Sequence, residues 1–317
     1  MQFFKGLSAR AIGVGAAIIT VGIWSAFIVI ARASAQGSLT PWDIALARIV
    51  GAAVVLLPLG AWLVRRDRAQ GAAAASSFGG LSPLALRITV LCGLFGGLGY
   101  ATLAYAGFFY APAAHASVLM PGSLPLWTTL LALLVLGTRI TPARAVGLAC
   151  IVLGDLLVGG ASLLRAFDGG EVWKGDLLFM SAALCWSAYS VLARRHGLDA
   201  VRATTAVTVF ALFSYVPLYL LLQALGLIDS RLAAAPWGEI LFQMAFQGLG
   251  SVVISGITFV RMIQHFGPVR STMITALVPG LSALGAVLFL GEPLSWNLWA
   301  GLVLVTVGIT FGVRKSV

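Results

Sequence analysis

Four polar side chains recur at four-residue steps within one apolar stretch of the sequence. They are Gln243, Gln247, Ser251 and Ser255, and Phe259 continues the series. Residues four apart lie on one face of an α-helix, so the series predicts a polar stripe on an otherwise apolar helix. Within a membrane, such amide and hydroxyl groups either face a cavity or hydrogen-bond neighbouring helices. We predict that the stripe lines a ligand cavity, with helix packing as the alternative.

Aromatic residues form a second set with binding chemistry. Trp24 and Trp186 occupy the same place in two similar segments, and Tyr189 follows Trp186 by three residues. Aromatic faces stack on flat or apolar groups and attract cations. We predict that these three residues face the same cavity, together with Tyr105 and Trp127. For Trp127, a role in helix packing is an equal alternative.

Arg48 and Asp155 are charged residues placed well inside apolar stretches. Ionised groups are costly in hydrocarbon and are usually paired there. Their similar predicted depth favours an ion pair between them. The alternatives are that Arg48 binds the carboxylate of a ligand, or that Asp155 carries a proton. His115 opens another apolar stretch, and histidine is the side-chain type whose charge can change near neutral pH, so this residue is either an interfacial residue or a proton sensor.

The composition indicates which elements must position these residues. Of the 317 residues, hydrophobic types make up 60% and charged types 9%. A water-soluble protein carries roughly 25% charged residues, so this class is excluded. With about 20 apolar residues per crossing and short connections, the chain is long enough for about ten membrane-spanning helices. The net charge of +10 needs no nucleic-acid partner, because basic residues accumulate in cytoplasmic loops.

Apolar stretches separated by turn residues or charges fit this number. We predict an all-α polytopic membrane protein with ten transmembrane helices, at residues 12–31, 41–64, 88–108, 113–136, 143–164, 177–193, 203–225, 240–262, 271–290 and 298–313. Cys92, Cys150 and Cys185 lie singly within these stretches, without the spacing of a metal site. No metal or other cofactor is therefore expected.

The basic residues predict the orientation of the chain. With both termini in the cytoplasm, fifteen of the twenty Lys and Arg residues lie on the cytoplasmic side, as the positive-inside rule requires. They are Lys5, Arg10, Arg65, Arg66, Arg68, Arg87, Arg139, Arg144, Arg194, Arg195, Arg202, Arg261, Arg270, Arg314 and Lys315. A cleavable signal peptide ending at Ala35 is a competing interpretation of the first stretch. Its apolar run of about 20 residues exceeds the usual 7 to 15, so we expect no cleavage.

Two parts of the chain resemble each other. Residues 24–32 and 186–194 share six identities in nine positions at an offset of 162. A second series has an offset of 154 and pairs Ser117 with Ser271, Pro125 with Pro279, Gly137 with Gly291, Gly147 with Gly301 and Gly154 with Gly308. We therefore predict two repeats of five spans each, at 1–164 and 172–317. Because five is odd, the second repeat is predicted to be inverted, an architecture common in secondary transporters.

Two of the repeated positions predict specific structural roles. Pro125 and Pro279 lie inside apolar stretches, where proline removes a helical hydrogen bond and bends the helix. We predict that they act as hinges that open and close a cavity, with a static bend as the alternative. The repeated glycines recur every seven residues within each repeat, which predicts close helix packing.

Several of these residues also carry a resemblance to a known family. They are the Trp-Ser-Ala of Trp24-Ser25-Ala26 and Trp186-Ser187-Ala188, Arg48, the paired Pro125 and Pro279, and Leu290-Gly291-Glu292. The chain resembles the EamA family of the drug/metabolite transporter superfamily over nearly its whole length. The resemblance implies a ten-helix inner-membrane carrier that exports amino acids, related metabolites or toxic compounds; similar members export aromatic amino acids or paraquat. One departure is Gly137-Thr138-Arg139, where the family usually has an acidic residue.

The functional prediction is a secondary transporter, either an exporter or a facilitator, that works by alternating access around a central cavity. Amino acids with apolar or aromatic side chains are the preferred cargo, because the predicted polar and aromatic faces contain no carboxylate. Export of cationic or amphipathic toxic compounds is the alternative. A membrane-embedded enzyme or a non-transport subunit is less favoured, since the sequence shows no catalytic constellation, and it lacks a phosphate-binding glycine loop. The expected partners are the bilayer and a small-molecule substrate, without nucleic acid, in a monomer or weak homodimer.

Overall fold

The computed structural model describes residues 9–71, 75–165, 170–275 and 277–313. All ten stretches predicted to cross the membrane are helical within this part of the chain, which confirms the predicted all-α class. Lys5, Arg314 and Lys315, which support the predicted orientation, lie outside the described residues, as do the side chains of Arg10 and Arg165.

The helices follow one another with short connections. The first repeat contains α1 (Ala9–Ser34), α2 (Pro41–Ala69), the 3-10 turn η1 (Phe78–Gly80), α3 (Leu86–Gly93), η2 (Leu94–Gly99), α4 (Tyr100–Tyr110), α5 (Ala113–Gly122), α6 (Leu124–Leu136) and α7 (Pro142–Arg165). The second contains α8 (Val172–Arg195), α9 (Ala200–Ala224), α10 (Trp237–Gln243), η4 (Met244–Ile254), α11 (Ser255–Phe266), α12 (Pro268–Ile274), α13 (Leu277–Leu290) and α14 (Trp296–Val313).

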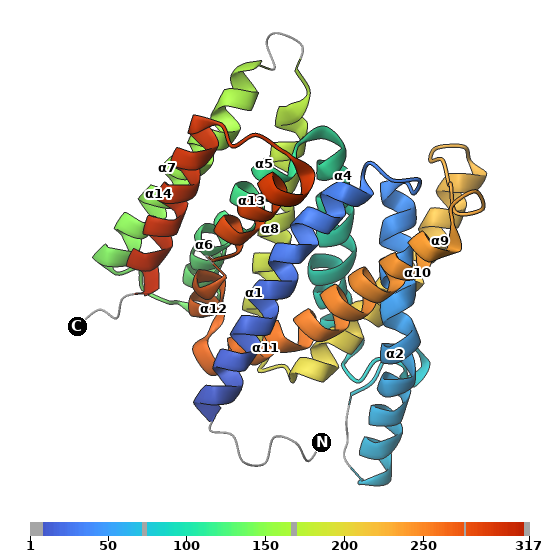
Figure 1. Ribbon diagram of the computed structural model, residues 1–317. Helices are drawn as coiled ribbons and strands as arrows, with labels where there is room; N and C mark the ends of the chain where they lie inside the picture. Colours follow the sequence, from blue (N-terminus) through green and yellow to red (C-terminus); the bar gives the residue numbers. More distant parts are fainter. Residues whose placement is uncertain (1–8, 72–74, 166–169, 276, 314–317) are drawn as a thin grey trace.

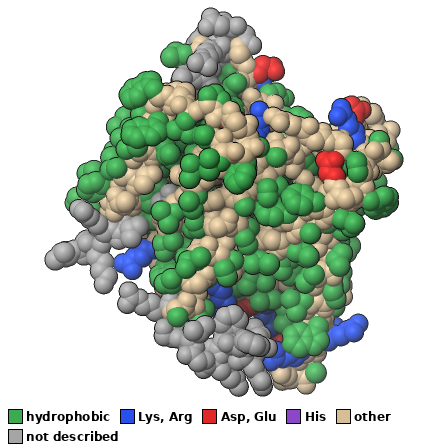
Figure 2. All heavy atoms as spheres, viewed as in Figure 1, with side chains coloured by type: hydrophobic (Ala, Val, Ile, Leu, Met, Phe, Trp, Pro, Cys, Tyr) green, Lys and Arg blue, Asp and Glu red, His purple; other side chains and the backbone are tan. Residues whose placement is uncertain are grey.

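The helices have the length and composition of membrane spans. Eight helical segments of the described chain are long and apolar enough to cross a bilayer, and α14 is a shorter apolar helix. The remaining helix, α7, has 24 residues and packs along α14. Figure 2 shows charged side chains gathered near two opposite ends of the visible face, with apolar side chains spread over the region between them. This distribution is the one that a bilayer requires of a protein surface.

The bundle has two ends that carry different connections (Figure 1). The start of α8 and the α13–α14 connection lie at the end that we call the α8 end. The start of α1, the end of α14 and the α2–α3 connection lie at the opposite end. The α8 end corresponds to the predicted extracellular end.

Local sequence signals explain where several helices begin and end. Thr40 and Asp43 form a capping box at the start of α2, in which each side chain accepts a hydrogen bond from the other's backbone N–H. Gly137 ends α6 with a φ of 64°, a left-handed conformation that glycine adopts without strain. Gly291, its counterpart in the repeat, follows α13 with a φ of 65°. The two repeats therefore end equivalent helices in the same way.

The repeated glycines let α7 and α14 pack closely, as the sequence predicted (Figure 1). A Cβ atom at Gly154 would lie 2.8 Å from the carbonyl oxygen of Gly301, and one at Gly308 would lie 2.4 Å from that of Gly147. Higher residue numbers on one helix face lower numbers on the other, so the two helices run antiparallel. Backbone contact at this distance leaves no room for side chains.

Two of the spans contain wider helical turns in place of a continuous α-helix, one between α3 and α4 and the other between α10 and α11. The segments η2 and η4 are π-helical, and they occupy overlapping positions of the repeats at the offset of 154. Short π-helical segments within α-helices are often found at functional sites. Their appearance in both repeats marks these two spans for the site described below.

The spans that contain Pro125 and Pro279 are broken rather than gently bent. The helix is interrupted at Ser123, between α5 and α6, and again between α12 and α13. Pro125 lies in the first turn of α6, and Pro279 lies near the start of α13. The helices are therefore distorted beside both prolines, with a break where a bend was predicted, and the role of the prolines as hinges stays a prediction. The sixth span also begins earlier than the predicted residue 177, since α8 starts at Val172.

Candidate functional site

The central pocket lies between helices of both repeats. Five parts of the chain form its wall: α2, the η2–α4 span, α8, α9 and the η4–α11 span. It is lined by Arg48, Ile49, Ala52, Gly96, Gly97, Ala101, Trp186, Tyr189, Thr204, Val207, Thr208, Ala211, Ser251, Val252 and Gly256. Both π-helical segments contribute to this wall. The cavity volume is about 30 Å³, which is room for one or two water molecules.

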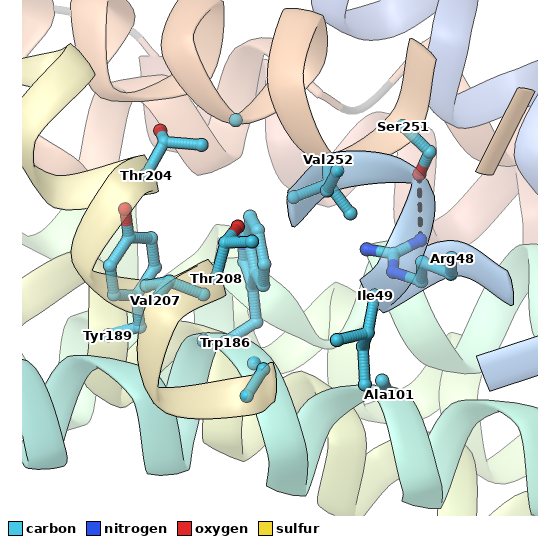
Figure 3. Close-up of a pocket in the computed structure, with 15 residues that line it drawn as sticks. Arg48, Ile49, Ala101, Trp186, Tyr189, Thr204, Val207, Thr208, Ser251 and Val252 are labelled. Atoms are coloured by element: carbon cyan, nitrogen blue, oxygen red, sulfur yellow. Dashed lines mark hydrogen bonds between the residues drawn. The ribbon is translucent and has the colours of Figure 1, made fainter. Parts of the chain in front are cut away.

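Arg48 is the charged residue of the central pocket. Its side chain is buried, with 6% of the residue exposed. The guanidinium donates a hydrogen bond of 2.9 Å to the Ser251 hydroxyl and lies 5.6 Å from the ring centre of Phe27. Figure 3 shows it extending from α2 toward the side of the pocket where Trp186 and Thr208 lie. Among the ion pairs of the described residues, none includes Arg48.

Two other polar groups of the central pocket have no hydrogen-bond partner among the described residues. Within the described chain, the Trp186 indole nitrogen and the Thr208 hydroxyl are buried and form no hydrogen bond. Both residues line the same cavity as Arg48. Buried polar groups are normally hydrogen-bonded, so unsatisfied groups around one cavity are those that a bound ligand would satisfy. The arrangement presents a guanidinium, an indole N–H and a hydroxyl to one small volume.

A second, aromatic pocket adjoins the central one. It is lined by Trp24, Phe27, Ile28, Tyr100, Met120, Pro121, Leu124, Trp186 and Val278, so Trp186 belongs to both pockets. The ring centre of Trp186 lies 5.5 Å from that of Trp24 and 4.8 Å from that of Tyr100. The aromatic pocket therefore adjoins the central one at Trp186, and its wall is apolar and aromatic.

The structure brings together most of the predicted aromatic set. Phe259 lies 4.9 Å from Trp24 and 5.5 Å from Trp186, between ring centres, and Tyr189 lies 5.3 Å from Trp186. Tyr105 instead packs on Phe27, outside the lining of either pocket, and its buried hydroxyl has no hydrogen-bond partner in the described chain.

Trp127 lies apart from both pockets. It packs against the second of two buried hydrophobic clusters, on α6, and its indole nitrogen forms no hydrogen bond to a described residue. This position agrees with the helix-packing alternative.

The polar stripe is buried between helices, and one of its members reaches the cavity. Ser251 lines the central pocket and bonds Arg48. Gln243 donates to the Ser34 hydroxyl of α1, and Ser255 accepts a hydrogen bond from the Trp24 indole. Gln247 is buried, and neither polar atom of its amide has a partner in the described part of the protein. The contacts of Gln243 and Ser255 are those of the packing alternative.

The expected ion pair between Arg48 and Asp155 is absent. Arg48 bonds Ser251, whereas Asp155 lines a different pocket, between α6, α7 and α8. The reason is the tertiary packing. α2 packs on α9 and η4, whereas α7 packs on α14, so the two side chains lie in different parts of the bundle although their predicted depths are similar. His115 lies at the start of α5, and its Nδ1 is 2.8 Å from Oδ1 of Asp176 on α8.

Sequence reasoning missed the threonines of α9. Thr204 and Thr208 line the central pocket one helical turn apart. Their four-residue spacing in the sequence is the same signal that singled out the polar stripe. Threonine is common in apolar helices, where its hydroxyl bonds the preceding turn, so the signal is weak by itself.

Contacts between distant helices close the α8 end of the bundle. Arg32 at the end of α1 forms an ion pair of 3.2 Å with Glu292, and the same carboxylate accepts hydrogen bonds from the backbone of Ala113 and Ala114 at the start of α5. At the opposite end, Arg202 of α9 pairs with Asp67 of α2 at 2.7 Å. Both ends are therefore held by ion pairs between parts of the chain that are distant in sequence.

Comparison with known proteins identifies the family. The model of the EamA-like transporter family matches residues 11–160 and again residues 173–314. The chain belongs to the EamA-like transporter family. The uncharacterized transporter YoaV of Bacillus subtilis (strain 168) is 23% identical over 243 residues, which cover 73% of this chain and 78% of that protein. A crystal structure of a protein with 23% identity matches over 96% of both chains, with a TM-score of 0.59, and supports the fold.

Membership gives the EamA-like chain a general activity. It is a small-molecule transporter of the drug/metabolite transporter superfamily, and it sits in a lipid bilayer. The family points to a transporter rather than an enzyme. The cavities described above are thus the places to look for its substrate.

Proposed function

We propose that the protein is a secondary transporter of small zwitterionic metabolites, and that amino acids with apolar or aromatic side chains bind in the central and aromatic pockets. The observation that carries the proposal is Arg48, a buried guanidinium that faces the central pocket without an acidic partner among the described residues. A buried charge without a counterion is costly, and a substrate carboxylate would supply that counterion.

The neighbours of Arg48 support a carboxylate rather than a cation. Guanidinium groups bind carboxylates through two parallel hydrogen bonds, and the indole N–H of Trp186 is a further donor. The Thr208 hydroxyl both donates and accepts, so it suits either end of a zwitterion. A positive charge on the pocket wall repels a cationic substrate, which weighs against export of cationic toxic compounds through this site.

The aromatic pocket supports the choice of side chain. Trp186 lies between the central pocket and the aromatic pocket, which is bounded by Trp24, Phe27 and Tyr100. An amino acid whose carboxylate meets Arg48 would extend its side chain past Trp186 into this space. Apolar and aromatic side chains would gain from burial and from ring contacts there.

Transport requires that the pockets open. A cavity of about 30 Å³ does not hold an amino acid, so the described conformation is nearly closed. We propose alternating access between two inverted repeats, with the breaks before Pro125 and Pro279 as hinges. The antiparallel contact of the repeated glycines on α7 and α14 supports the inversion, because a two-fold axis through this crossing would exchange the two helices. The location proposed is a bacterial-type inner membrane with both termini in the cytoplasm.

The test is counterflow of labelled amino acids in liposomes that contain the purified protein. For the unmodified protein we expect saturable counterflow of aromatic and large aliphatic amino acids. Arg48→Gln removes the counterion and should raise KM by at least about 30-fold, because loss of a buried charge partner costs about 2 kcal/mol or more. Arg48→Lys keeps the positive charge but cannot form two parallel hydrogen bonds to a carboxylate, so its KM should lie between that of the unmodified protein and that of Arg48→Gln.

Arg139→Gln is the matched control, since it removes an exposed arginine outside both pockets. It should transport like the unmodified protein. Unchanged KM in Arg48→Gln would contradict the role of this residue. Transport of organic cations but of no amino acid by the unmodified protein would overturn the substrate proposal. Cysteine labelling from each side of intact cells tests the orientation.

A further inference from the structure

Two arginines meet at the end of the bundle opposite the α8 end. Arg144 lies in the first turn of α7, which runs antiparallel to α14 and therefore begins where α14 ends. Arg270 lies in α12, which packs against both α6 and α14 (Figure 1). We refer to these two residues as the arginine pair.

The guanidinium of Arg144 is fixed in place but only partly satisfied. One of its terminal nitrogens donates a hydrogen bond of 3.3 Å to the backbone carbonyl of Arg139, in the connection between α6 and α7. Its Nε is buried and has no hydrogen-bond partner among the described residues. Buried N–H groups are normally hydrogen-bonded, so this donor lacks an acceptor that a bound group would supply.

The charge of the arginine pair is not balanced within the described chain. Arg270 lies close enough for its positive charge to act on the guanidinium of Arg144. None of the ion pairs between described residues includes either arginine. Of the acidic residues described at this end, Asp67 pairs with Arg202, and Asp199 caps the start of α9. Like charges that are held close together repel each other, and an anion bound between them removes the repulsion.

The second repeat shows the equivalent corner with its charge balanced. Glu292 follows α13, pairs with Arg32 and accepts hydrogen bonds from the start of α5. At the offset of 154, Thr138 takes the place of Glu292, and α12 takes the place of α5. The corner between α6 and α7 therefore has no carboxylate where its counterpart has one, and an anion from outside the chain can supply the missing charge.

The surroundings of the arginine pair favour a lipid as the source of that anion. Leu134, in the last turn of α6, is 79% exposed, and Val146, two residues after Arg144, is 51% exposed. In a bilayer, exposed apolar side chains of this kind contact acyl chains. Basic groups next to such a surface fit a ligand with a negative headgroup and an apolar tail. A free anion would use the arginines alone.

We propose that the arginine pair binds the headgroup of an anionic phospholipid. The phosphate oxygens accept hydrogen bonds from Arg144 and Arg270 and so join the start of α7 to α12, while the acyl chains lie along Leu134 and Val146. The lipid then has the role at this end that the carboxylate of Glu292 has at the α8 end. The predicted orientation places it in the cytoplasmic leaflet, which is the leaflet with anionic lipids.

This site is independent of the proposed amino-acid site. Neither arginine of the pair lines the central pocket or the aromatic pocket. A failure of amino-acid counterflow would leave the lipid site unaffected, and the reverse is also true.

The test measures equilibrium binding of radiolabelled phosphatidylglycerol to the purified, delipidated full-length protein in dodecyl maltoside micelles. We expect saturable binding to one site per chain. Phosphatidylcholine with the same acyl chains should not displace the probe at equal concentration, because it has no net charge and its choline group is repelled by the arginines. Inorganic phosphate at equal concentration should not displace it either, because it has no acyl chains.

Substitutions separate lipid binding from folding. Arg144→Gln and Arg270→Gln should each weaken binding about tenfold, a loss of about 1.4 kcal/mol, because each removes a charge-assisted hydrogen bond to the phosphate. Arg65→Gln is the matched control, since it removes an exposed arginine near the end of α2, and it should bind like the unmodified protein.

A melting curve without lipid adds a readout that a merely structural arginine would not give. Arg270→Gln should melt at the temperature of the unmodified protein or above it, because the substitution removes the repulsion of Arg144. An arginine that only stabilised the fold would lower the melting temperature when it is replaced.

Four results would overturn the proposal. They are the absence of saturable binding to the unmodified protein, displacement by phosphatidylcholine or by inorganic phosphate as effective as displacement by unlabelled phosphatidylglycerol, equal affinity of Arg270→Gln and Arg65→Gln, and a lower melting temperature of lipid-free Arg270→Gln. If Arg144→Gln fails to fold, Arg270→Gln decides the question, because the side chain that it replaces is exposed.

Discussion

The crossing of α7 and α14 allows a quantitative prediction from one methyl group. Gly308→Ala places a Cβ atom 2.4 Å from the carbonyl oxygen of Gly147, and 3.0 Å from both Cys150 Cβ and Ile151 Cγ1. Cβ atoms in real proteins essentially never lie closer than 3.0 Å to such an atom. Since the nearest atom belongs to the backbone of a packed helix, the two helices must separate locally.

The size of the effect follows from this distance. The required shift is at least about 0.6 Å, the difference between 2.4 and 3.0 Å, and a gap of this size costs neighbouring atom pairs a quarter to a half of their dispersion energy. Overpacking of this kind costs roughly 1–3 kcal/mol. The gain in helix propensity from Gly to Ala offsets up to about 1 kcal/mol. With a cost of about 2 kcal/mol, the middle of that range, and this offset, we expect a net loss of about 1–2 kcal/mol, or a melting temperature that is lower by on the order of 3–6 °C.

The assay is thermal unfolding of the purified protein in detergent, followed by tryptophan fluorescence. Gly22→Ala is the matched control, because a Cβ at Gly22 in α1 meets nothing within 4 Å. This variant should melt at the same temperature as the unmodified protein or slightly above it. Equal melting temperatures for Gly308→Ala and Gly22→Ala would refute the close backbone contact between α7 and α14.

Three further variants test other contacts. Glu292→Gln removes the ion pair with Arg32, so the α8 end should open more often, and a cysteine placed in the central pocket should react about two- to fivefold faster with a thiol reagent added at that end. Unchanged reactivity would mean that this ion pair does not hold the α8 end closed. Tyr219→Phe removes a 2.6 Å hydrogen bond to the buried carboxylate of Asp43 and should lower stability in thermal melts by about 1–2 kcal/mol, whereas an unaltered melt would argue against that bond. Trp186→Leu removes the indole ring that an aromatic substrate would stack on, so it should raise the KM for aromatic amino acids about tenfold and that for aliphatic ones much less. Equal changes of KM for both classes would count against aromatic stacking.

Residues with a local physical meaning were well predicted from the sequence. Gly154 and Gly308 recur at the offset of 154 within apolar stretches, and small residues in this pattern fit where helix backbones meet in a membrane. Pro125 and Pro279 predict distorted helices, because proline lacks the N–H that a helix needs, and the structure has a break beside each of them. The structure has both the close contact and the interruptions.

The π-helical segments escaped the same reasoning. The four-residue steps from Gln243 to Ser255 predict one straight α-helical face, but η4 winds through most of this stretch with a wider turn. A wider turn depends on which helices press on the segment, and no residue type signals it. This change of winding is one reason why Ser251 reaches the central pocket while Gln243 bonds α1.

The sequence by itself determined that the chain crosses a membrane many times, because 9% charged residues cannot solvate a surface. It also determined the repeat and the candidate residues, which depend on residue type and spacing along one segment. The tertiary structure decided which of these residues meet. Arg48 and Asp155 have similar depths in sequence, yet they face different cavities, because rotation about a helix axis and the choice of neighbouring helix are set by packing of the whole bundle.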